Sequence, residues 1–259
     1  MSRILDLSGR TVIVTGGGRG VGRGISECFL AAGADVVICG RNRPESLPAH
    51  AGRSATFVAA DVRELEQIDA VVRSAQERTG RLDVLVNNAG GAPAADAATA
   101  SPRFSEAILR LNLIAPLHFA QRANAVMQQQ AEGGVIINIA SVSGMRPSPG
   151  TAAYGAAKAG VLSLTQTLAV EWAPKVRVVA VTAGMIRTEQ SELHYGDEAG
   201  IAAVGATVPL GRMGEPTDVG DACVFLASPL AGYVSGASLL VHGGGERPAF
   251  LAAAKNTKA

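Results

Sequence analysis

The sequence predicts one α/β domain built on a doubly wound parallel sheet of seven strands, with helices on both faces. Three observations support this prediction. Short β-branched runs alternate with longer helical patterns, the runs are apolar without polar alternation, and 259 residues suit one large domain. Because such strands are buried on both sides and parallel crossovers are right-handed, helices must cover both faces of the sheet.

The expected elements alternate along the chain from the first strand, which reads TVIVT. The helix after it ends at Gly33, a residue suited to the left-handed position that follows a helix. The expected strands are Thr11–Thr15, Asp35–Cys39, Thr56–Ala59, Asp83–Val86, Val135–Ile139, Val176–Val181 and Leu239–Val241. The expected helices are Val21–Ala32, Glu64–Arg78, one or two over Ser101–Glu132, Thr151–Trp172 and Pro216–Leu226.

Composition and charge exclude several classes of protein. An apolar content of 47% with a net charge of +1 is unlike a disordered chain or a nucleic-acid-binding surface, and 17% charged residues argue against a coiled coil. No apolar run approaches the ~20 residues of a membrane span, and the first residues lack the long apolar stretch of a signal peptide. Three widely spaced cysteines without a CxxC favour a reduced, cytoplasmic setting. We therefore expect a small-molecule partner, with no nucleic acid, membrane or metal.

A glycine-rich loop, Thr15–Gly22, follows the first strand and opens the first helix. Glycines let the backbone approach a phosphate closely, and a helix N-terminus offers unpaired N–H groups and the positive end of its dipole. The alternative is a structural turn, but the placement between a buried strand and a helix favours a dinucleotide pyrophosphate. This placement is typical of a Rossmann-type domain.

The end of the second strand bears on which dinucleotide is bound. Sites for NAD usually carry a carboxylate there for the ribose 2′-hydroxyl, whereas this chain reads Cys-Gly-Arg-Asn-Arg over 39–43. Arg41, and Arg19 inside the glycine loop, can pair with a 2′-phosphate through the planar guanidinium. We predict a preference for NADP(H), with NAD(H) possible; the alternative is that both arginines are solvated surface residues.

A tyrosine and a lysine stand four residues apart, at Tyr154 and Lys158, and so share one helix face. Lysine is rare in this chain, and a nearby cation stabilises a phenolate and lowers the tyrosine pKa from its usual value of about 10. Ser141 ends the fifth strand, and sites in open parallel sheets lie at the carboxyl ends of strands. The pattern predicts an acid–base site; the alternative is an exposed pair that arose by chance.

These motifs, in this order, resemble the short-chain dehydrogenase/reductase family over nearly the whole chain. They are TGxxxGxG at 15–22, Asp61-Val62, Asn-Asn-Ala-Gly at 87–90, and Ser141 thirteen residues before the Tyr154–Lys158 pair. The resemblance implies a homotetrameric oxidoreductase that transfers a hydride between NAD(P)(H) and a secondary alcohol or ketone. The implied catalytic residues are Asn112, Ser141, Tyr154 and Lys158. The implied cofactor-binding residues, with Arg19 and Arg41 added, are Gly16, Gly20, Val21, Gly22, Asp61, Val62, Asn88, Ala89, Gly90, Tyr154, Lys158, Gly184, Ile186 and Thr188.

The resemblance also assigns roles. Tyr154 is the general acid in reduction and the base in oxidation, and Lys158 lowers its pKa and binds the nicotinamide ribose. Ser141 holds the substrate oxygen, Asn112 interrupts its helix and holds a water, and Asp61 binds the adenine. The domain is then expected to span 1–259, with a cofactor half over about 1–140, a catalytic and substrate half over about 141–250, and a frayed tail at 252–259.

Two positions depart from the family pattern after the sixth strand. Val179 and Ala183 stand where an asparagine and a proline are frequent, and without the proline the following loop is expected to be more mobile. Catalysis itself has two alternatives, a lyase or epimerase on the same fold and a non-catalytic dinucleotide-binding sensor.

The segments expected to form the substrate pocket are Gly91–Pro102, Val142–Arg146 and Glu189–Pro209. Their small apolar residues predict a roomy apolar cleft for a bulky alcohol or ketone, steroid-like or an acyl thioester. Solvated side chains are the favoured interpretation of Arg103, Arg146, Arg187 and His194 in and beside these segments. Phe250 and Leu251 are expected to pack against a neighbouring subunit.

Overall fold

The computed structural model describes residues 5–250, and Leu251 and the tail at 252–259 lie outside that range. Its main sheet has seven strands in the order β5-β2-β1-β6-β7-β8-β9, all parallel, so the predicted fold class is confirmed. The strand order reverses between β1 and β6, and ligands bind beyond the carboxyl ends of strands at such a point. The strands are β1 (Thr11–Thr15), β2 (Asp35–Gly40), β5 (Thr56–Ala59), β6 (Val84–Asn87), β7 (Gly134–Ser141), β8 (Val176–Ala183) and β9 (Ser238–Val241).

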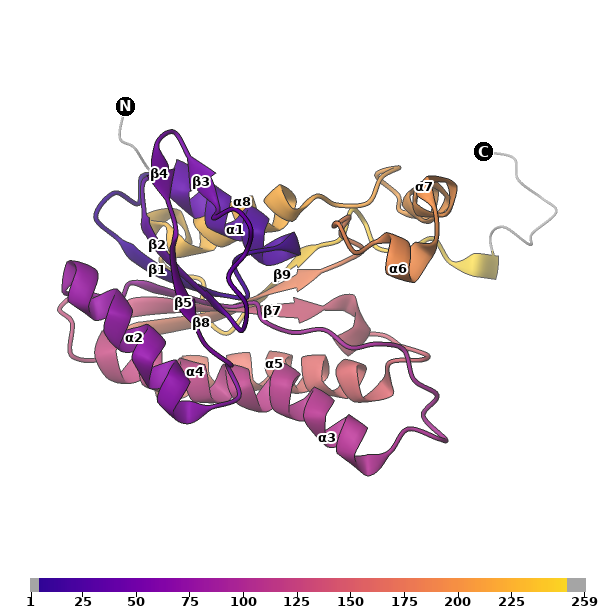
Figure 1. Ribbon diagram of the computed structural model, residues 1–259, viewed down its shortest axis with the longest axis horizontal. Helices are drawn as coiled ribbons and strands as arrows, with labels where there is room; N and C mark the ends of the chain where they lie inside the picture. Colours follow the sequence, from indigo (N-terminus) through magenta and orange to yellow (C-terminus); the bar gives the residue numbers. More distant parts are fainter. Residues whose placement is uncertain (1–4, 251–259) are drawn as a thin grey trace.

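Helices cover both faces of the sheet (Figure 1). One face carries α1 (Gly20–Ala31) and α8 (Pro216–Ala227), and the other carries α2 (Leu65–Thr79), α4 (Ala115–Met127) and α5 (Ala152–Glu171), with α3 (Pro102–Leu109) beside α5. Two shorter helices, α6 (Glu192–Tyr195) and α7 (Glu198–Thr207), lie beyond the carboxyl end of the sheet. Within residues 5–250, no helix is both long and apolar enough to cross a membrane.

The packing of the first strand explains why its three central residues are all apolar. Val12 and Val14 face the core beneath α1 and α8, while Ile13 faces the core beneath α2 and α4. All three side chains are fully buried, because neighbouring residues of a strand point to opposite faces and both faces are covered.

Part of the glycine content lets α1 pack closely against α8. A Cβ on Gly24 would lie 2.4 Å from Cβ of Pro216, and one on Gly220 would lie 2.5 Å from Sγ of Cys28. Both distances are too short for a side chain, so larger residues would push the helices apart. The contact fixes α1, whose N-terminus follows the glycine loop.

The structure contains two features that the sequence did not predict. A small hairpin, β3 (Ala49–His50) and β4 (Arg53–Ser54), was not predicted, because two-residue strands carry no recognisable periodicity. Helices α6 and α7 were also missed, since one is four residues long and the other has apolar residues around its whole circumference. The segment Ser101–Glu132, predicted to form one helix or two, forms two α-helices that are joined by a π-helical turn at Arg110–Ile114.

A buried chain of polar side chains ties α5 to the sheet. Nδ2 of Asn87 donates to Oδ1 of Asn138 at 3.0 Å, and Nδ2 of Asn138 donates to Oγ1 of Thr165 at 3.0 Å. The three residues are at most 4% exposed. Because α5 carries the Tyr154–Lys158 pair and β7 ends at Ser141, this chain helps to hold those groups in register.

Replacing Asn138 with leucine is expected to lower the free energy of unfolding by about 1–3 kcal/mol. The change keeps the branched shape of the side chain but removes a buried acceptor from Asn87 and a donor from Thr165. Urea unfolding followed by circular dichroism measures the loss. Thr167→Val, which removes an exposed hydroxyl bonded within α5, should stay within about 0.5 kcal/mol of the parent. An Asn138→Leu protein as stable as the parent would contradict the assignment.

Candidate active site

The glycine loop forms a cradle between β1 and α1. Gly16 and Gly20 have φ of 65° and 51°, in the left-handed region that favours glycine. A Cβ on Gly22 would lie 2.3 Å from the carbonyl oxygen of Gly16, so only glycine, whose side chain is a hydrogen atom, fits at this position of the turn. Arg19, the N-cap residue of α1, makes no side-chain capping bond, and Val21 packs its side chain against the core. Free helix amides beside a bare backbone fit the pyrophosphate of a dinucleotide.

The carboxyl end of β6 forms the floor beside this cradle. The backbone N–H groups of Asn88 and Ala89 both donate to Oγ1 of Thr15 at 2.9 Å, and Nδ2 of Asn88 donates to the carbonyl oxygen of Thr15 at 2.9 Å. A Cβ on Gly90 would lie 2.6 Å from Oδ1 of Asn112. Thr15 was not among the predicted site residues. Its hydroxyl group at the last position of the first strand could have identified it as a site residue.

Charged groups lie at the far end of the cradle, where the adenosine half of a dinucleotide is expected. Asp61 follows β5 and pairs with Arg63, and this partner lowers the pKa of the carboxyl to about 2. Val62 is buried beneath it. Arg19 and Arg41 are both exposed, and within residues 5–250 no hydrogen bond or ion pair joins the two.

The four predicted catalytic residues gather at the carboxyl ends of β6 and β7. Ser141 ends β7, and Tyr154 and Lys158 lie on successive turns of α5. Nζ of Lys158 lies 5.6 Å from the centre of the Tyr154 ring and donates to the carbonyl oxygen of Ile139 at 2.7 Å. Burial lowers the pKa of Lys158 to about 8. The structure thus brings these groups together, and their catalytic roles stay predictions.

Asn112 lies inside the π-helical turn, as the resemblance implied. Its Nδ2 donates to the carbonyl oxygens of Ile108 and Gly91 at 2.9 and 3.0 Å, and its Oδ1 accepts the N–H of Gly91 at 2.8 Å. The extra residue of a π turn leaves backbone groups without their helical partners, and such turns are frequent at functional sites. Here the amide fixes the start of the loop that borders Tyr154.

The pKa of Tyr154 is raised, opposite to the expected direction. Burial is the main cause, the charge of Tyr195 adds to it, and a hydrogen bond with Ser141 partly offsets it. Lys158 is not among the causes of this shift, and its ammonium group donates to the carbonyl oxygen of Ile139. At neutral pH the phenol therefore carries its proton, the form that a general acid needs.

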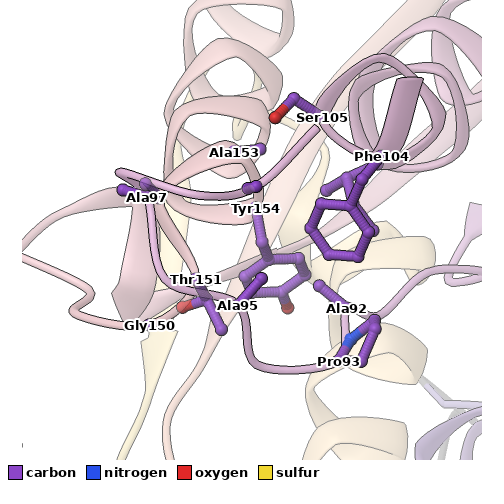
Figure 2. A pocket seen from close by; sticks show the side chains of 13 residues that line it. Ala92, Pro93, Ala95, Ala97, Phe104, Ser105, Gly150, Thr151, Ala153 and Tyr154 are labelled. Carbon is purple, nitrogen blue, oxygen red and sulfur yellow. The ribbon is translucent and has the colours of Figure 1, made fainter. Parts of the chain in front are cut away.

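An apolar pocket borders Tyr154, with a volume of about 100 Å³. Figure 2 shows the rings of Tyr154 and Phe104 facing the loop that carries Ala92, Pro93 and Ala95. Ser105 and Thr151 add hydroxyl groups to an otherwise apolar wall. The loop at 91–102 therefore lines the pocket, as the sequence predicted. The other two expected segments, 142–146 and 189–209, are not among its lining residues, and the pocket is smaller than the roomy cleft that was expected.

The segment after β8 is held by backbone hydrogen bonds. Ala183 is the last residue of β8 and pairs with both neighbouring strands, β7 and β9. Val179 is a fully buried core residue. The N–H of Gly184 donates to Val241, while Met185 and Arg187 bond to Gly214 on either side of Ile186. The methyl group of Thr188 lies next to Gly20, which joins this segment to the cradle.

Two of the three arginines considered for a substrate anion have partners within the protein. Arg146 pairs with Glu246, and Arg187 pairs with Glu198 at 2.7 Å. Arg103 and His194 are exposed, in agreement with the solvated interpretation.

Comparisons with known proteins agree with this geometry. Residues 16–246 match the family model described as enoyl-(acyl carrier protein) reductase. A 3β-hydroxysteroid dehydrogenase of Eggerthella lenta is 37% identical over 246 residues, covering 92% of this chain and 94% of that protein. A 3-oxoacyl-[acyl-carrier-protein] reductase of Vibrio harveyi is 34% identical over 245 residues, covering 93% of this chain and 98% of that protein.

A solved structure extends the comparison. The ligand-free aldohexose dehydrogenase of Thermoplasma acidophilum superposes with a TM-score of 0.86 at 29% identity, covering 98% of both chains. The matches span the cradle, the floor and the Ser-Tyr-Lys group described above. The chain therefore belongs to the short-chain dehydrogenase/reductase family, a family of oxidoreductases that act on CH–OH groups with nicotinamide cofactors.

Proposed function

We propose that the protein transfers a hydride between NADP(H) and a bulky, apolar secondary alcohol or ketone. The observation that carries this proposal is the position of the Tyr154 phenol, which lies in the wall of an apolar pocket next to Ser141. A bound nicotinamide would supply the hydride chemistry, and the protein aligns the reactants and supplies the proton.

The side chains divide the remaining work. Tyr154 gives its proton to the carbonyl oxygen in reduction and takes it back in oxidation. The Ser141 hydroxyl donates a hydrogen bond to the same oxygen, where negative charge grows in the transition state. Lys158 stabilises the phenolate that the proton leaves behind and binds the ribose hydroxyls. Asn112 holds a water that links Lys158 to solvent, and through this relay the phenolate takes up a new proton.

The cofactor preference rests on Arg41 and Arg19, because β2 ends without a carboxylate. We expect Arg41→Gln to raise KM for NADPH at least about fivefold and to change KM for NADH less than about twofold, since only NADPH carries the 2′-phosphate that a guanidinium binds. Initial rates with each cofactor measure both constants. A wild-type enzyme with the lower KM for NADH would overturn the preference.

The substrate class rests on the apolar wall formed by Phe104 and the alanine-rich loop. Absorbance of NADPH at 340 nm, followed over a panel of steroid ketones, acyl thioesters and aldohexoses, tests it. We expect turnover with the first two groups. The panel includes aldohexoses because one structural relative is an aldohexose dehydrogenase. Turnover of small sugars or polyols alone would remove the apolar substrate from the proposal.

The assembly proposed is a homotetramer in the cytoplasm. Strand β9 is an edge of the sheet whose Leu239 and Leu240 are 37% and 43% exposed, and Phe250 is 70% exposed. An exposed apolar edge strand is a surface that a second copy can cover. The three cysteines are free thiols, which suits a reducing compartment. Sedimentation that showed a monomer would contradict the tetramer.

A further inference from the structure

Arg63 holds the side chain of Asp61 with three hydrogen bonds. Its backbone N–H and Nε donate to Oδ1 of Asp61 at 3.0 and 2.9 Å, and Nη2 donates to Oδ2 at 2.5 Å. This is the fork geometry in which a guanidinium binds a carboxylate most specifically. Asp61 is the residue assigned to the adenine in the proposed function, on which this inference rests.

The backbone around the pair is fixed as well. The N–H of Asp61 donates to Oε1 of Gln67 at 2.7 Å, and the N–H of Glu64 donates to the carbonyl oxygen of Asp61 at 3.0 Å. Nη2 of Arg110 donates to the carbonyl oxygen of Arg63 at 3.1 Å. Because both the turn and the carboxylate are held from several sides, the Asp61 oxygens have one preferred orientation before any ligand binds.

The two oxygens of Asp61 differ in what they can still accept. A carboxylate oxygen accepts about two hydrogen bonds. Oδ1 already receives two, whereas Oδ2 receives one from the residues that the structure describes. The Asp61 side chain is 20% exposed, so a ligand can reach it. Its pKa of about 2 keeps the carboxylate ionised, and so an acceptor, throughout the physiological range.

We propose that Arg63 is a positioning residue for the cofactor: it fixes the Asp61 carboxylate so that Oδ2 accepts an N–H of the adenine amino group. Without the Arg63 side chain, the carboxylate keeps only the hydrogen bond from the backbone N–H of residue 63, and Oδ2 has to be ordered when the cofactor binds. The cost of this ordering falls on the affinity for the adenosine half and leaves the reacting half unchanged.

Equilibrium binding tests the proposal without turnover. NADPH fluorescence titrations of the whole protein should give a Kd at least about fivefold higher for Arg63→Gln than for the parent, with Arg63→Lys in between because it restores the charge but not the fork. Adenosine 5′-monophosphate, measured as a competitor of NADPH, should lose a similar factor. Reduced nicotinamide mononucleotide should keep its KM, and kcat at saturating NADPH should stay within about twofold.

Two controls separate positioning from a general loss of structure. Arg73→Gln removes the same charge from an exposed site on α2 and should leave Kd unchanged. In an Asp61→Asn background, Arg63→Gln should add little further loss, because the two residues act through one contact. Thermal unfolding of each variant confirms that it is folded.

Three outcomes would overturn the inference: unchanged affinity of Arg63→Gln for the adenosine ligands, an equal loss with the mononucleotide, or the full loss retained in the Asp61→Asn background. If wild-type protein bound neither NADPH nor NADH, the proposed function itself would fail, which is a different result.

Discussion

Replacing Tyr154 with phenylalanine is expected to lower kcat by more than ~100-fold, the scale of general acid catalysis by a positioned side chain. The change removes one oxygen atom from a half-buried ring that lines the pocket and contacts the Lys158 ammonium. The ring keeps its packing, so the pocket keeps its shape. Steady-state kinetics with NADPH and the best substrate of the panel measures the loss.

The same variant should bind cofactor almost as well as the parent, because the phenol acts on the reacting oxygen. Its Kd for NADPH should stay within about threefold, which separates lost chemistry from lost binding. Tyr233→Phe, which removes the same atom from a fully exposed ring, should keep full activity. A Tyr154→Phe enzyme with near-parental turnover would remove Tyr154 from the mechanism, and with it the proposed acid–base scheme.

Replacing Gly22 with alanine is expected to weaken NADPH binding at least about tenfold, equivalent to roughly 1.4 kcal/mol. The new Cβ would lie 2.3 Å from the carbonyl oxygen of Gly16 and 2.5 Å from Nδ2 of Asn88. Neither atom can retreat easily, because Gly16 belongs to the cradle and Asn88 is bonded to Thr15. The loop has to open, and its amides then lose the arrangement that suits a pyrophosphate. Fluorescence titration with NADPH measures the effect.

Gly18, in the same loop, provides the matched control for this substitution. The three atoms nearest to a Cβ on Gly18 would all belong to the ring of Pro44, at 3.1–3.5 Å, so an alanine fits after a small shift. We expect Gly18→Ala to bind NADPH within about threefold of the parent. Equal affinity of Gly22→Ala and the parent would show that the cradle tolerates an added carbon and would contradict the geometry described.

The sequence predicted the elements whose periodicity is strong and whose burial is complete. Strand β1 matches its predicted bounds because both of its faces are covered, which makes all five residues buried. Strand β6 begins at Val84, one residue later than predicted, and the Asp83 carboxylate just before it accepts hydrogen bonds from Arg10, Arg81 and the backbone of Thr11. Such side-chain contacts cannot be read from a hydrophobic pattern.

The site was predictable where a residue acts through its own place in a motif. Ser141, Tyr154 and Lys158 lie together because a strand end and one helix face bring them there. The direction of the Tyr154 pKa shift was not predictable, since its main cause is the burial of the side chain in the folded protein. Arg63 was missed for a similar reason: its partner is two residues away, and only the folded turn shows the fork.

The cradle of the glycine loop has a consequence for mutational scanning. At most positions an alanine scan removes atoms and reports what the lost side chain contributed. At Gly22 the same scan adds an atom where the volume is already occupied, and at Gly16 and Gly20 it adds one to a left-handed backbone that favours glycine. A binding surface made of backbone has no side chain to delete, so truncation cannot map it. We therefore expect added atoms to be harmful in the phosphate loop, whereas around Tyr154 we expect the removal of reactive atoms to be harmful.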